Sequence, residues 1–283
     1  MKNIVLLPNP SKDKGLRLTR LVAEKLIEYK HVVYLSDELG FSLDGITGYK
    51  NFPKDAELMI VIGGDGSMLD ASVLALENDI AILGVNLGKV GYLSEVEPEN
   101  IDILGQISEN NYKINEMMLL EATHISKGES KRSSRLAVND VIISHNSFLG
   151  IAEFKLENSF SDYVKYRADG IILSTPQGST AYSLSAGGAI VSHIIDSIVA
   201  TPICPHSFFN RSIIFNPNEK LTLENDGKTE LNVSIDGRFF TNLATGDKCV
   251  IGRANKKLKM LTFNDNNMFS TLFKKMKILE DIK

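Results

Sequence analysis

The stretch Leu58-Met59-Ile60-Val61-Ile62-Gly63-Gly64-Asp65-Gly66-Ser67-Met68-Leu69 guides the interpretation of the whole sequence. It begins with an unbroken apolar run, which is typical of a strand covered on both faces in a parallel sheet. Glycines then interrupt the run, and an apolar pattern at helical spacing begins at Met68. A strand, a glycine loop and a helix in this order direct free backbone N–H groups at one point, with the helix dipole behind them. The stretch therefore predicts a loop suited to binding a phosphate.

Asp65 is the unusual member of this loop. A carboxylate repels phosphate unless it holds a metal ion or takes a proton from an attacking hydroxyl. The alternative is an ordinary tight turn, because Gly-Asp-Gly is good turn chemistry anywhere. Its position after a buried strand favours a functional site, with Asp65 as the candidate catalytic residue. The residues expected to form the phosphate loop around it are Gly63, Gly64, Gly66 and Ser67.

The composition places the chain among soluble globular proteins. A length of 283 residues allows one large domain or two ordinary ones. The net charge of −4 gives no indication of a nucleic-acid surface. Two cysteines are too few for a disulfide framework, and neither a signal peptide nor an apolar run of membrane-spanning length is visible. We expect a reduced, cytoplasmic protein without nucleic-acid or membrane partners.

The first part of the chain alternates strands with helices, which predicts a doubly wound, Rossmann-like α/β domain over residues 1–112. The expected elements are strands at Ile4–Leu7, His31–Leu35, Leu58–Ile62 and Ile80–Val85, with helices from Leu16 to Ile27 and after Asp65. Ligands of such sheets bind beyond the carboxyl ends of the strands, where Asp65 falls. A second glycine-bearing loop, Asn86–Leu93, is expected at the same edge. Its Lys89 is either a solvated charge or a phosphate contact.

The pattern changes near Tyr112 to short, closely spaced strands, which predicts an all-β sandwich over residues 113–255. Asn225-Asp226-Gly227-Lys228 and Asp236-Gly237 are strong hairpin signals within it. The tail over residues 256–283 has a helix-friendly, cationic pattern. We expect the tail to pack back on the α/β domain or on a partner chain.

A second constellation lies inside this β-rich half, from Asp169 to Gly188, where hydroxyls and glycines are dense. Small residues let a flat or phosphorylated ligand approach the backbone, and Ser179 and Thr180 are possible caps of a short helix. An ordinary linker is the alternative, but a linker does not follow a strand as apolar as Ile171-Ile172-Leu173.

Asn139 and Asp140 are two adjacent polar residues inside the apolar run from Leu136 to Ile143. Neither is comfortable in a buried strand without partners, so they mark either a β-bulge or edge position, or a pair that binds hydroxyls or an amide of a ligand. In the second case we expect them to ring a cleft between the two domains with Asp65 and Asp169. The sequence shows no nucleophilic triad and no zinc-ligand spacing, and its scattered histidines are expected to be structural.

These motifs resemble those of the NAD kinases, the ATP-NAD kinase family, over most of the chain. The matching stretches follow one another in the family's order: Gly63–Ser67, Asn86–Leu93, Asn139-Asp140, Asp169–Gly188 and Pro205-His206. The glycine-aspartate loop is shared with diacylglycerol and sphingosine kinases and with 6-phosphofructokinases, and is moderately specific. The motif from Thr175 to Gly188 is highly specific.

The resemblance implies a metal-dependent kinase that transfers the γ-phosphoryl group of ATP to the 2′-hydroxyl of the adenosine ribose of NAD, giving NADP. It implies Mg²⁺ or another divalent cation and a homodimer or homotetramer with the NAD site near a subunit interface. By resemblance, Asp65 takes the proton of the 2′-hydroxyl or holds the metal, and Arg167 contacts a phosphate. The NAD-binding residues implied are Asp65, Gly66, Asn139, Asp140, Arg167, Asp169, Thr180, Ala181, Tyr182, Ser183, Leu184, Ser185 and Cys204.

The sequence also departs from the family pattern. Ser67 replaces a usual Thr and keeps its hydroxyl, whereas Asp140 is one methylene shorter than the usual Glu. Gln177 and Ala189 stand where Thr and Pro are usual, and Arg238 stands where Gln is common.

Two other functions stay open at this stage. A lipid kinase of the same superfamily needs an apolar acceptor groove and leaves the Thr175–Gly188 motif unexplained. A non-catalytic NAD-binding regulator is disfavoured by the intact Asp65 loop. The choice between ATP and polyphosphate, and between NAD and NADH, is not encoded in these motifs.

Overall fold

The computed structural model describes residues 1–87, 91–128, 132–146, 150–206 and 208–263. The chain divides into two compact units, which are described separately: Met1–Glu116 together with the chain from Leu258 on, and Met117–Lys257. Among the described residues, no helix is both long enough and apolar enough to cross a membrane.

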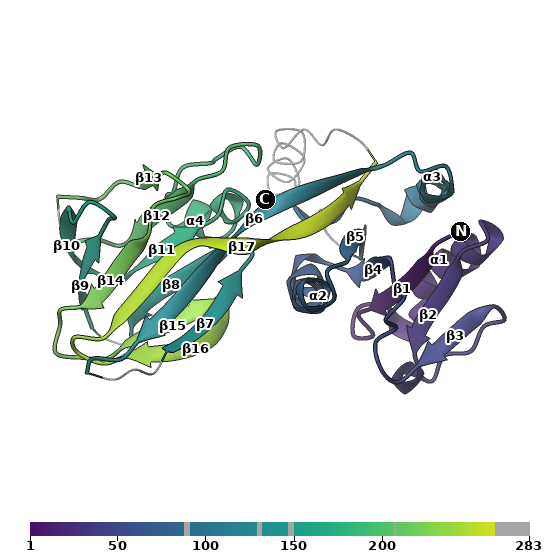
Figure 1. Ribbon diagram of the computed structural model, residues 1–283, viewed down its shortest axis with the longest axis horizontal. Coiled ribbons are helices and arrows are strands. Elements are labelled where there is room, and N and C mark those ends of the chain that lie inside the picture. Colours follow the sequence, from purple (N-terminus) through teal and green to yellow (C-terminus); the bar gives the residue numbers. More distant parts are fainter. Residues whose placement is uncertain (88–90, 129–131, 147–149, 207, 264–283) are drawn as a thin grey trace, which may run out of the picture. The chain divides into compact units, whose positions relative to one another are not determined.

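The first unit is built on a parallel sheet whose strands occur in the order β3-β2-β1-β4-β5 (Figure 1). The strands are β1 (Asn3–Pro8), β2 (Val32–Ser36), β3 (Ile46–Tyr49), β4 (Leu58–Gly63) and β5 (Ala81–Asn86). The helices are α1 (Arg17–Glu28), α2 (Asp65–Asn78) and α3 (Gly105–Ser108), and the 3₁₀ turns are η1 (Lys14–Leu16), η2 (Asp37–Leu39) and η3 (Pro98–Leu104).

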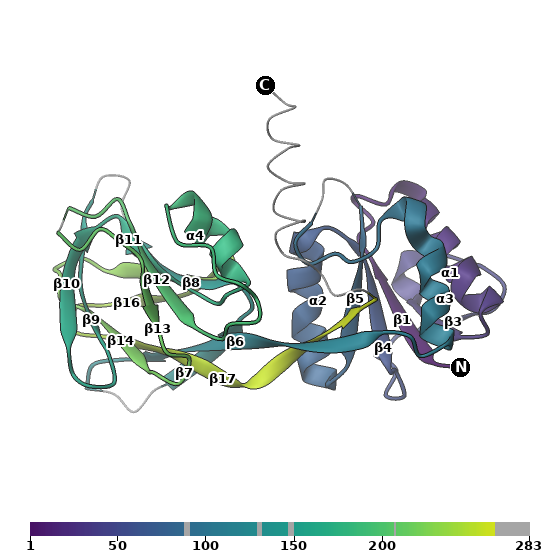
Figure 2. The same ribbon diagram turned by 90° about the horizontal axis from the view of Figure 1, so that it is seen from above.

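Helices cover both faces of this sheet, which explains its apolar strands. α2 lies on one face, and α1 and α3 lie on the other (Figure 2). Every residue of β4 and of β5 is buried, so neither strand shows polar alternation. Leu6, Ile60 and Leu83 belong to the core cluster that also contains Leu26 of α1.

The second unit is an antiparallel sandwich. One layer contains β6 (Lys113–Ile125), β7 (Arg132–Ala137), β9 (Ala152–Glu157), β10 (Tyr163–Ala168), β14 (Leu221–Asn225) and β17 (Lys248–Thr262). The other contains β8 (Asp140–His145), β11 (Gly170–Ser174), β12 (Ile198–Ile203), β13 (Ile213–Phe215), β15 (Leu231–Ile235) and β16 (Arg238–Leu243). Two short helical turns, η4 (Gly178–Thr180) and α4 (Tyr182–Ser185), follow β11. Side chains from both layers, such as Phe154 and Ile171, form one core.

The last described strand, β17, returns to the first sheet. It pairs with β14 in the sandwich layer and, through Met260 opposite Ile82, runs parallel to β5. The predicted fold class is therefore confirmed. The expected helical character at the start of the tail is wrong, because residues up to Thr262 continue β17; the remaining tail residues, 264–283, lie outside the described residues.

Candidate active site

Asp65 is the first residue of α2, directly after the extended Gly64 that forms the N-cap. Its carboxylate is held by a neighbouring loop: Oδ2 accepts the N–H of Tyr92 and Oδ1 accepts that of Leu93, each at 3.1 Å. A Cβ on Gly91 would lie 2.6 Å from Asp65 Oδ1, so any larger residue there would displace the carboxylate. The loop after β5 thus meets the glycine loop as expected and fixes the orientation of the carboxylate. Gly88 and Lys89 of that loop lie outside the described residues.

A third loop, which follows β1, also reaches this point. Asn9 Nδ2 donates to Ser67 Oγ at 2.8 Å, and a Cβ on Gly63 would lie 2.4 Å from that same hydroxyl. The Lys12 ammonium lies 3.0 Å from where a Cβ on Gly64 would stand, so a cation borders the glycine loop. Sequence reasoning missed Asn9 and Lys12. The predicted parallel sheet could have indicated them, because adjacent parallel strands bring their carboxyl ends, and the loops that follow, to one edge.

Asn139 and Asp140 are not inside one strand, contrary to the prediction. β7 ends at Ala137 and β8 begins at Asp140, so the chain changes from one sandwich layer to the other at Val138 and Asn139. The backbone N–H groups of this segment all donate to the carboxylate of Asp236. These bonds replace the strand ladder and allow the break within an apolar run.

The Thr175–Gly178 turn packs directly against this segment. Thr175 Oγ1 donates to the Val138 carbonyl at 2.7 Å, and the Thr175 N–H donates to the Asn139 carbonyl at 2.9 Å. Thr175 Oγ1 also accepts the N–H of Gly178 at 3.0 Å. Two of the motifs predicted from sequence are therefore in direct contact.

The segment Thr180–Ser185 forms the end of η4 and all of α4. The proposed capping role of Ser179 and Thr180 is wrong: both lie within η4, and their hydroxyls donate back to the carbonyls of Pro176 and Gln177. Ser183 is fully buried and its hydroxyl bonds to Thr201 at 3.0 Å. Tyr182 and Ser185 are exposed, so they and the backbone are what a ligand would meet.

Asp140 has an unusual electrostatic environment. It is only 4% exposed and lies opposite Ser174 in the β8–β11 register. Burial first, and the negative charge of Asp236 second, raise the pKa of Asp140 to about 7. Ser174 Oγ is buried and finds no hydrogen-bond partner among the described residues. These two polar groups on one sheet face are suited to hydroxyls of a ligand.

Asp169 and Cys204, two further residues predicted to bind NAD, lie near the other end of β11. Asp169 precedes Gly170, which is opposite Ser144, whereas Asp140 is opposite Ser174 at the far end of β11. This register separates the two ends by four residues of strand, or about 13 Å. Asp169 donates its N–H to Ile203, directly before the exposed Cys204. One chain therefore does not bring Asp140 and Asp169 together.

Arg167 of β10 lies close to Asp169 in the chain, and we call Asp169, Arg167 and Cys204 the second group. Its side chain is exposed and forms an ion pair with Glu153 at 3.0 Å. Its carbonyl accepts the N–H of His206 at 2.7 Å, so Pro205-His206 also lies at this end.

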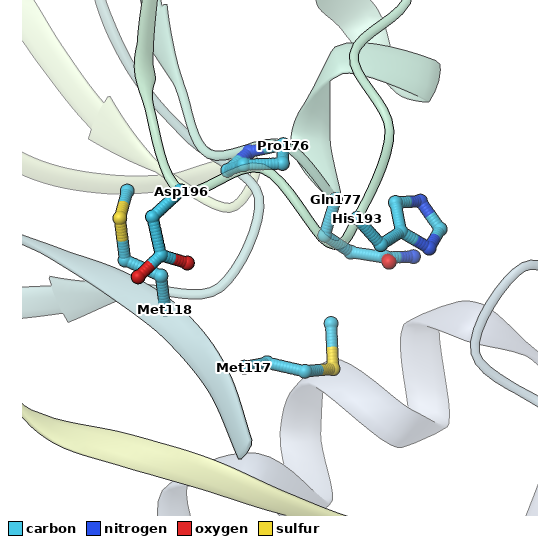
Figure 3. A pocket seen from close by; sticks show the side chains of 6 residues that line it. All are labelled: Met117, Met118, Pro176, Gln177, His193 and Asp196. Atoms are coloured by element: carbon cyan, nitrogen blue, oxygen red, sulfur yellow. The ribbon is translucent and has the colours of Figure 1, made fainter. Parts of the chain in front are cut away.

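A small pocket adjoins the buried turn at Pro176 and Gln177 (Figure 3). Its other lining residues are Met117, Met118, His193 and Asp196. Figure 3 shows Asp196 beside Met118, and Gln177 beside His193. The Asp196 carboxylate is engaged by Arg253 at 3.1 Å, which leaves two thioethers, an amide and the His193 imidazole as the pocket's main chemistry.

Comparisons with known proteins agree with these motifs. The ATP-NAD kinase N-terminal domain model matches residues 6–112, and the ATP-NAD kinase C-terminal domain model matches residues 138–263. The NAD kinase of Lachnoclostridium phytofermentans is 36% identical over 280 residues, covering 96% of this chain and 98% of the relative. The NAD kinase of Thermoanaerobacter sp. (strain X514) is 33% identical, covering 98% of this chain and 99% of the relative.

Two solved structures share the fold. Yeast NADH kinase complexed with NADH has a TM-score of 0.85 at 21% identity, covering 96% of this chain and 86% of that chain. An NAD kinase from Archaeoglobus fulgidus in complex with ATP has a TM-score of 0.73 at 21% identity, covering 97% of this chain and 98% of that chain. With both domain models matched and relatives above 30% identity over nearly the full length, the chain belongs to the ATP-NAD kinase family.

Proposed function

We propose that this chain transfers the γ-phosphoryl group of ATP to the 2′-hydroxyl of the adenosine ribose of NAD, giving NADP and ADP. Membership of the ATP-NAD kinase family supports ATP as donor and NAD as acceptor. The structural observation that carries the proposal is the Asp65 carboxylate. The N–H groups of Tyr92 and Leu93 fix it at the start of α2, beside the glycine loop.

In the proposed reaction, Asp65 accepts the proton of the 2′-hydroxyl while that oxygen bonds to the γ-phosphorus. The bond between the γ-phosphorus and the bridging oxygen breaks, and ADP leaves with the bonding electrons. Phosphoryl transfer needs positioning and charge neutralisation more than covalent chemistry. The N-terminal N–H groups of α2 and the Lys12 ammonium supply positive potential where the phosphates would lie.

A divalent cation such as Mg²⁺ fits this loop only as a partner of the nucleotide. Among the described residues, no group of three or more His, Cys, Asp or Glu side chains is arranged to hold a metal ion. Magnesium is commonly held by one or two carboxylates together with substrate phosphates. Asp65 would supply the carboxylate, and the cation would neutralise charge on the phosphates.

We assign the adenosine ribose of NAD to the group formed by Asn139, Asp140 and the α4 segment. Asp140 and Ser174 offer polar atoms on one sheet face. Tyr182 and Ser185 offer exposed side chains from the short helical segment that follows β11. Asp169, Arg167 and Cys204 form the second group, at the opposite end of the strands.

The separation of these groups supports a homo-oligomer. If both groups contact the same part of one NAD molecule, the second group must come from another subunit whose sheet end meets the first. A homodimer is the minimum assembly for this arrangement, and a homotetramer satisfies it equally. The two cysteines are free thiols, which is consistent with a reducing compartment such as the cytoplasm.

The experiment that tests the function measures NADP formation from NAD, ATP and Mg²⁺ by the wild type, Asp65→Asn and Glu77→Gln. Asp65→Asn keeps the size of the side chain, removes the base and replaces one oxygen that accepts the N–H of Tyr92 or Leu93. A general base typically contributes ~10²–10⁴-fold, so a rate loss of at least that range is expected. Glu77→Gln is the matched control, because Glu77 is an exposed carboxylate on the same helix. Phosphorylation of a diacylglycerol, but not of NAD, would instead support a lipid kinase. NAD binding without NADP formation would indicate a non-catalytic regulator.

A further inference from the structure

The carboxylate of Asp236 is engaged by three consecutive backbone N–H groups. Its Oδ2 accepts from Val138 at 2.8 Å, and its Oδ1 accepts from Asn139 at 2.7 Å and from Asp140 at 3.1 Å. The Asp236 N–H in turn donates to the Asp140 carbonyl at 3.0 Å. Hydrogen bonds to a charged acceptor are roughly twice as strong as neutral ones. One side chain therefore holds the whole segment at which the chain changes sandwich layers.

The conformation of Asp236 is specific to its turn. Asp236 has φ +49° and Gly237 has φ +76°, so both residues of the β15–β16 connection are left-handed. This is the geometry of a tight type I′ hairpin, which Asp-Gly favours. The tight turn places the carboxylate beside the neighbouring segment, where the three N–H groups hold it.

The same segment is fixed from the other side by the Thr175–Gly178 turn. Thr175 binds the carbonyls of Val138 and Asn139, while Asp236 binds the amides. Gly178 closes the arrangement, because a Cβ there would fall 1.9 Å from the Asn139 carbonyl oxygen. Asn139 and Asp140 thus sit between two supports that come from remote parts of the chain.

We infer that Asp236 is a positioning residue for NAD, acting through the backbone of Asn139 and Asp140. This inference rests on the proposed function, since it takes those two residues as part of the NAD site. The carboxylate of Asp236 accepts three backbone N–H groups of the Val138–Asp140 segment, so its proposed role requires no contact with the nucleotide. Loss of its charge is expected to weaken NAD binding and leave ATP binding unaffected, because ATP is proposed to bind at the Gly63–Ser67 loop, which belongs to the first unit and not to the unit that contains Asp236.

The charge of Asp236 also influences Asp140. It is the second cause, after burial, of the raised pKa of Asp140. Burial raises the pKa of Asp236 as well, while its three amide donors favour the ionised form. Neutralising Asp236 is therefore expected to lower the pKa of Asp140, a change that a purely structural defect elsewhere would not produce.

The test compares Asp236→Asn with Asp247→Asn. Asn adopts positive φ readily, so the hairpin is preserved, but its amide NH₂ replaces one oxygen that accepts an N–H. Asp247 is the matched control, because its carboxylate also accepts backbone N–H groups, from Lys127 at 2.8 Å and from Ala244 at 3.1 Å. Both variants lose buried hydrogen bonds of the same kind in the same unit.

Three readouts are measured on the full chain: amide hydrogen exchange of residues 138–140, KM for NAD and for ATP, and the pH profile of kcat/KM for NAD. For Asp236→Asn we expect faster amide exchange at residues 138–140 and a KM for NAD raised by roughly tenfold or more, with an unchanged KM for ATP. The apparent pKa of Asp140 in the pH profile of kcat/KM should shift downward. Asp247→Asn should change none of these three.

A KM for NAD within twofold of the wild type, despite faster exchange at residues 138–140, would overturn the inference. So would an equal rise in the KM for ATP, because that indicates general damage. If the wild type makes no NADP, the proposed function fails separately. NAD affinity measured by calorimetry on the same variants would then decide the positioning role.

Discussion

Gly178 lies so close to Asn139 that a Cβ added to it would fall 1.9 Å from the Asn139 carbonyl oxygen. Two motifs that are far apart in the sequence are thereby in backbone contact. We predict that Gly178→Ala displaces the Val138–Asp140 segment, raises the KM for NAD more than tenfold and destabilises the fold by about 1–3 kcal/mol, as overpacking does. Steady-state kinetics and urea unfolding check this prediction.

Gly252→Ala is the control for that substitution. A Cβ on Gly252 meets Lys220 Cγ at 3.4 Å, an ordinary contact, and its backbone is not left-handed. Its KM for NAD should equal that of the wild type. Wild-type NAD kinetics in Gly178→Ala would show that the close approach is not needed for the site.

Lys12 provides a prediction for the phosphate donor. Its ammonium borders the backbone of Gly64, where the phosphates of ATP are proposed to lie. Lys12→Gln should raise the KM for ATP by roughly three- to tenfold, because an exposed charge–phosphate contact is partly screened by solvent. The KM for NAD should change less than twofold.

The control for Lys12 is Lys14→Gln, which removes an exposed lysine two residues further along the same loop region. Initial rates at several ionic strengths sharpen the comparison, because the wild-type dependence on salt should weaken only in Lys12→Gln. Equal effects of the two substitutions would argue for general surface electrostatics instead of a specific contact.

The raised pKa of Asp140 predicts a pH dependence of stability. In the unfolded chain this carboxyl ionises near pH 4, whereas in the folded chain it holds its proton up to about pH 7. The unfolded state therefore loses the proton first, and folding stability falls as the pH rises from about 4 to 7. Asp140→Asn should remove this loss, so the stability advantage of the variant over the wild type should grow by up to about 4 kcal/mol between pH 4 and pH 8, measured by urea unfolding.

Asp247 should show the opposite sign. Its pKa is lowered by the N–H donors of Lys127 and Ala244 and by His124, although burial opposes them. Its contribution to stability is present above the unfolded pKa near 4 and is lost as the pH falls below it. Asp247→Asn should flatten the acid limb of the curve below about pH 4, and an unchanged acid limb in that variant would contradict the assignment.

The two groups of candidate NAD residues predict complementation between subunits. Asn139→Ala and Asp169→Ala alter residues at opposite ends of β8 and β11, and each variant alone should be inactive. In a mixed dimer, one of the two sites combines the intact group of one subunit with the intact group of the other, and the second site combines the two altered groups. Co-refolding equal amounts should restore about a quarter of the wild-type rate for dimers with two equivalent sites. A mixture that stays inactive would place both groups in the site of a single chain.

The sequence by itself determined the features that are contiguous along the chain. The apolar run before Gly63, the glycines and the helical pattern after Asp65 are local, so the strand, loop and helix followed from residue types and spacing. The change to short strands after Tyr112 likewise predicted the sandwich, and the motif order predicted the family. These predictions succeeded because secondary structure and motif chemistry depend on near neighbours.

Only the tertiary structure decided which remote residues support the site. The contact of Asn9 with Ser67 arises from the parallel pairing of β1 with β4, and that of Asp236 with Val138 arises from a hairpin almost a hundred residues away. The sequence did not predict the break between β7 and β8 at Asn139, because the apolar pattern is the same whether one strand continues or the chain crosses to the other sandwich layer. Hydrogen bonds across such distances leave no periodic signal, since they depend on strand register and not on local spacing. Register alone placed Asp140 and Asp169 at opposite ends of one sheet.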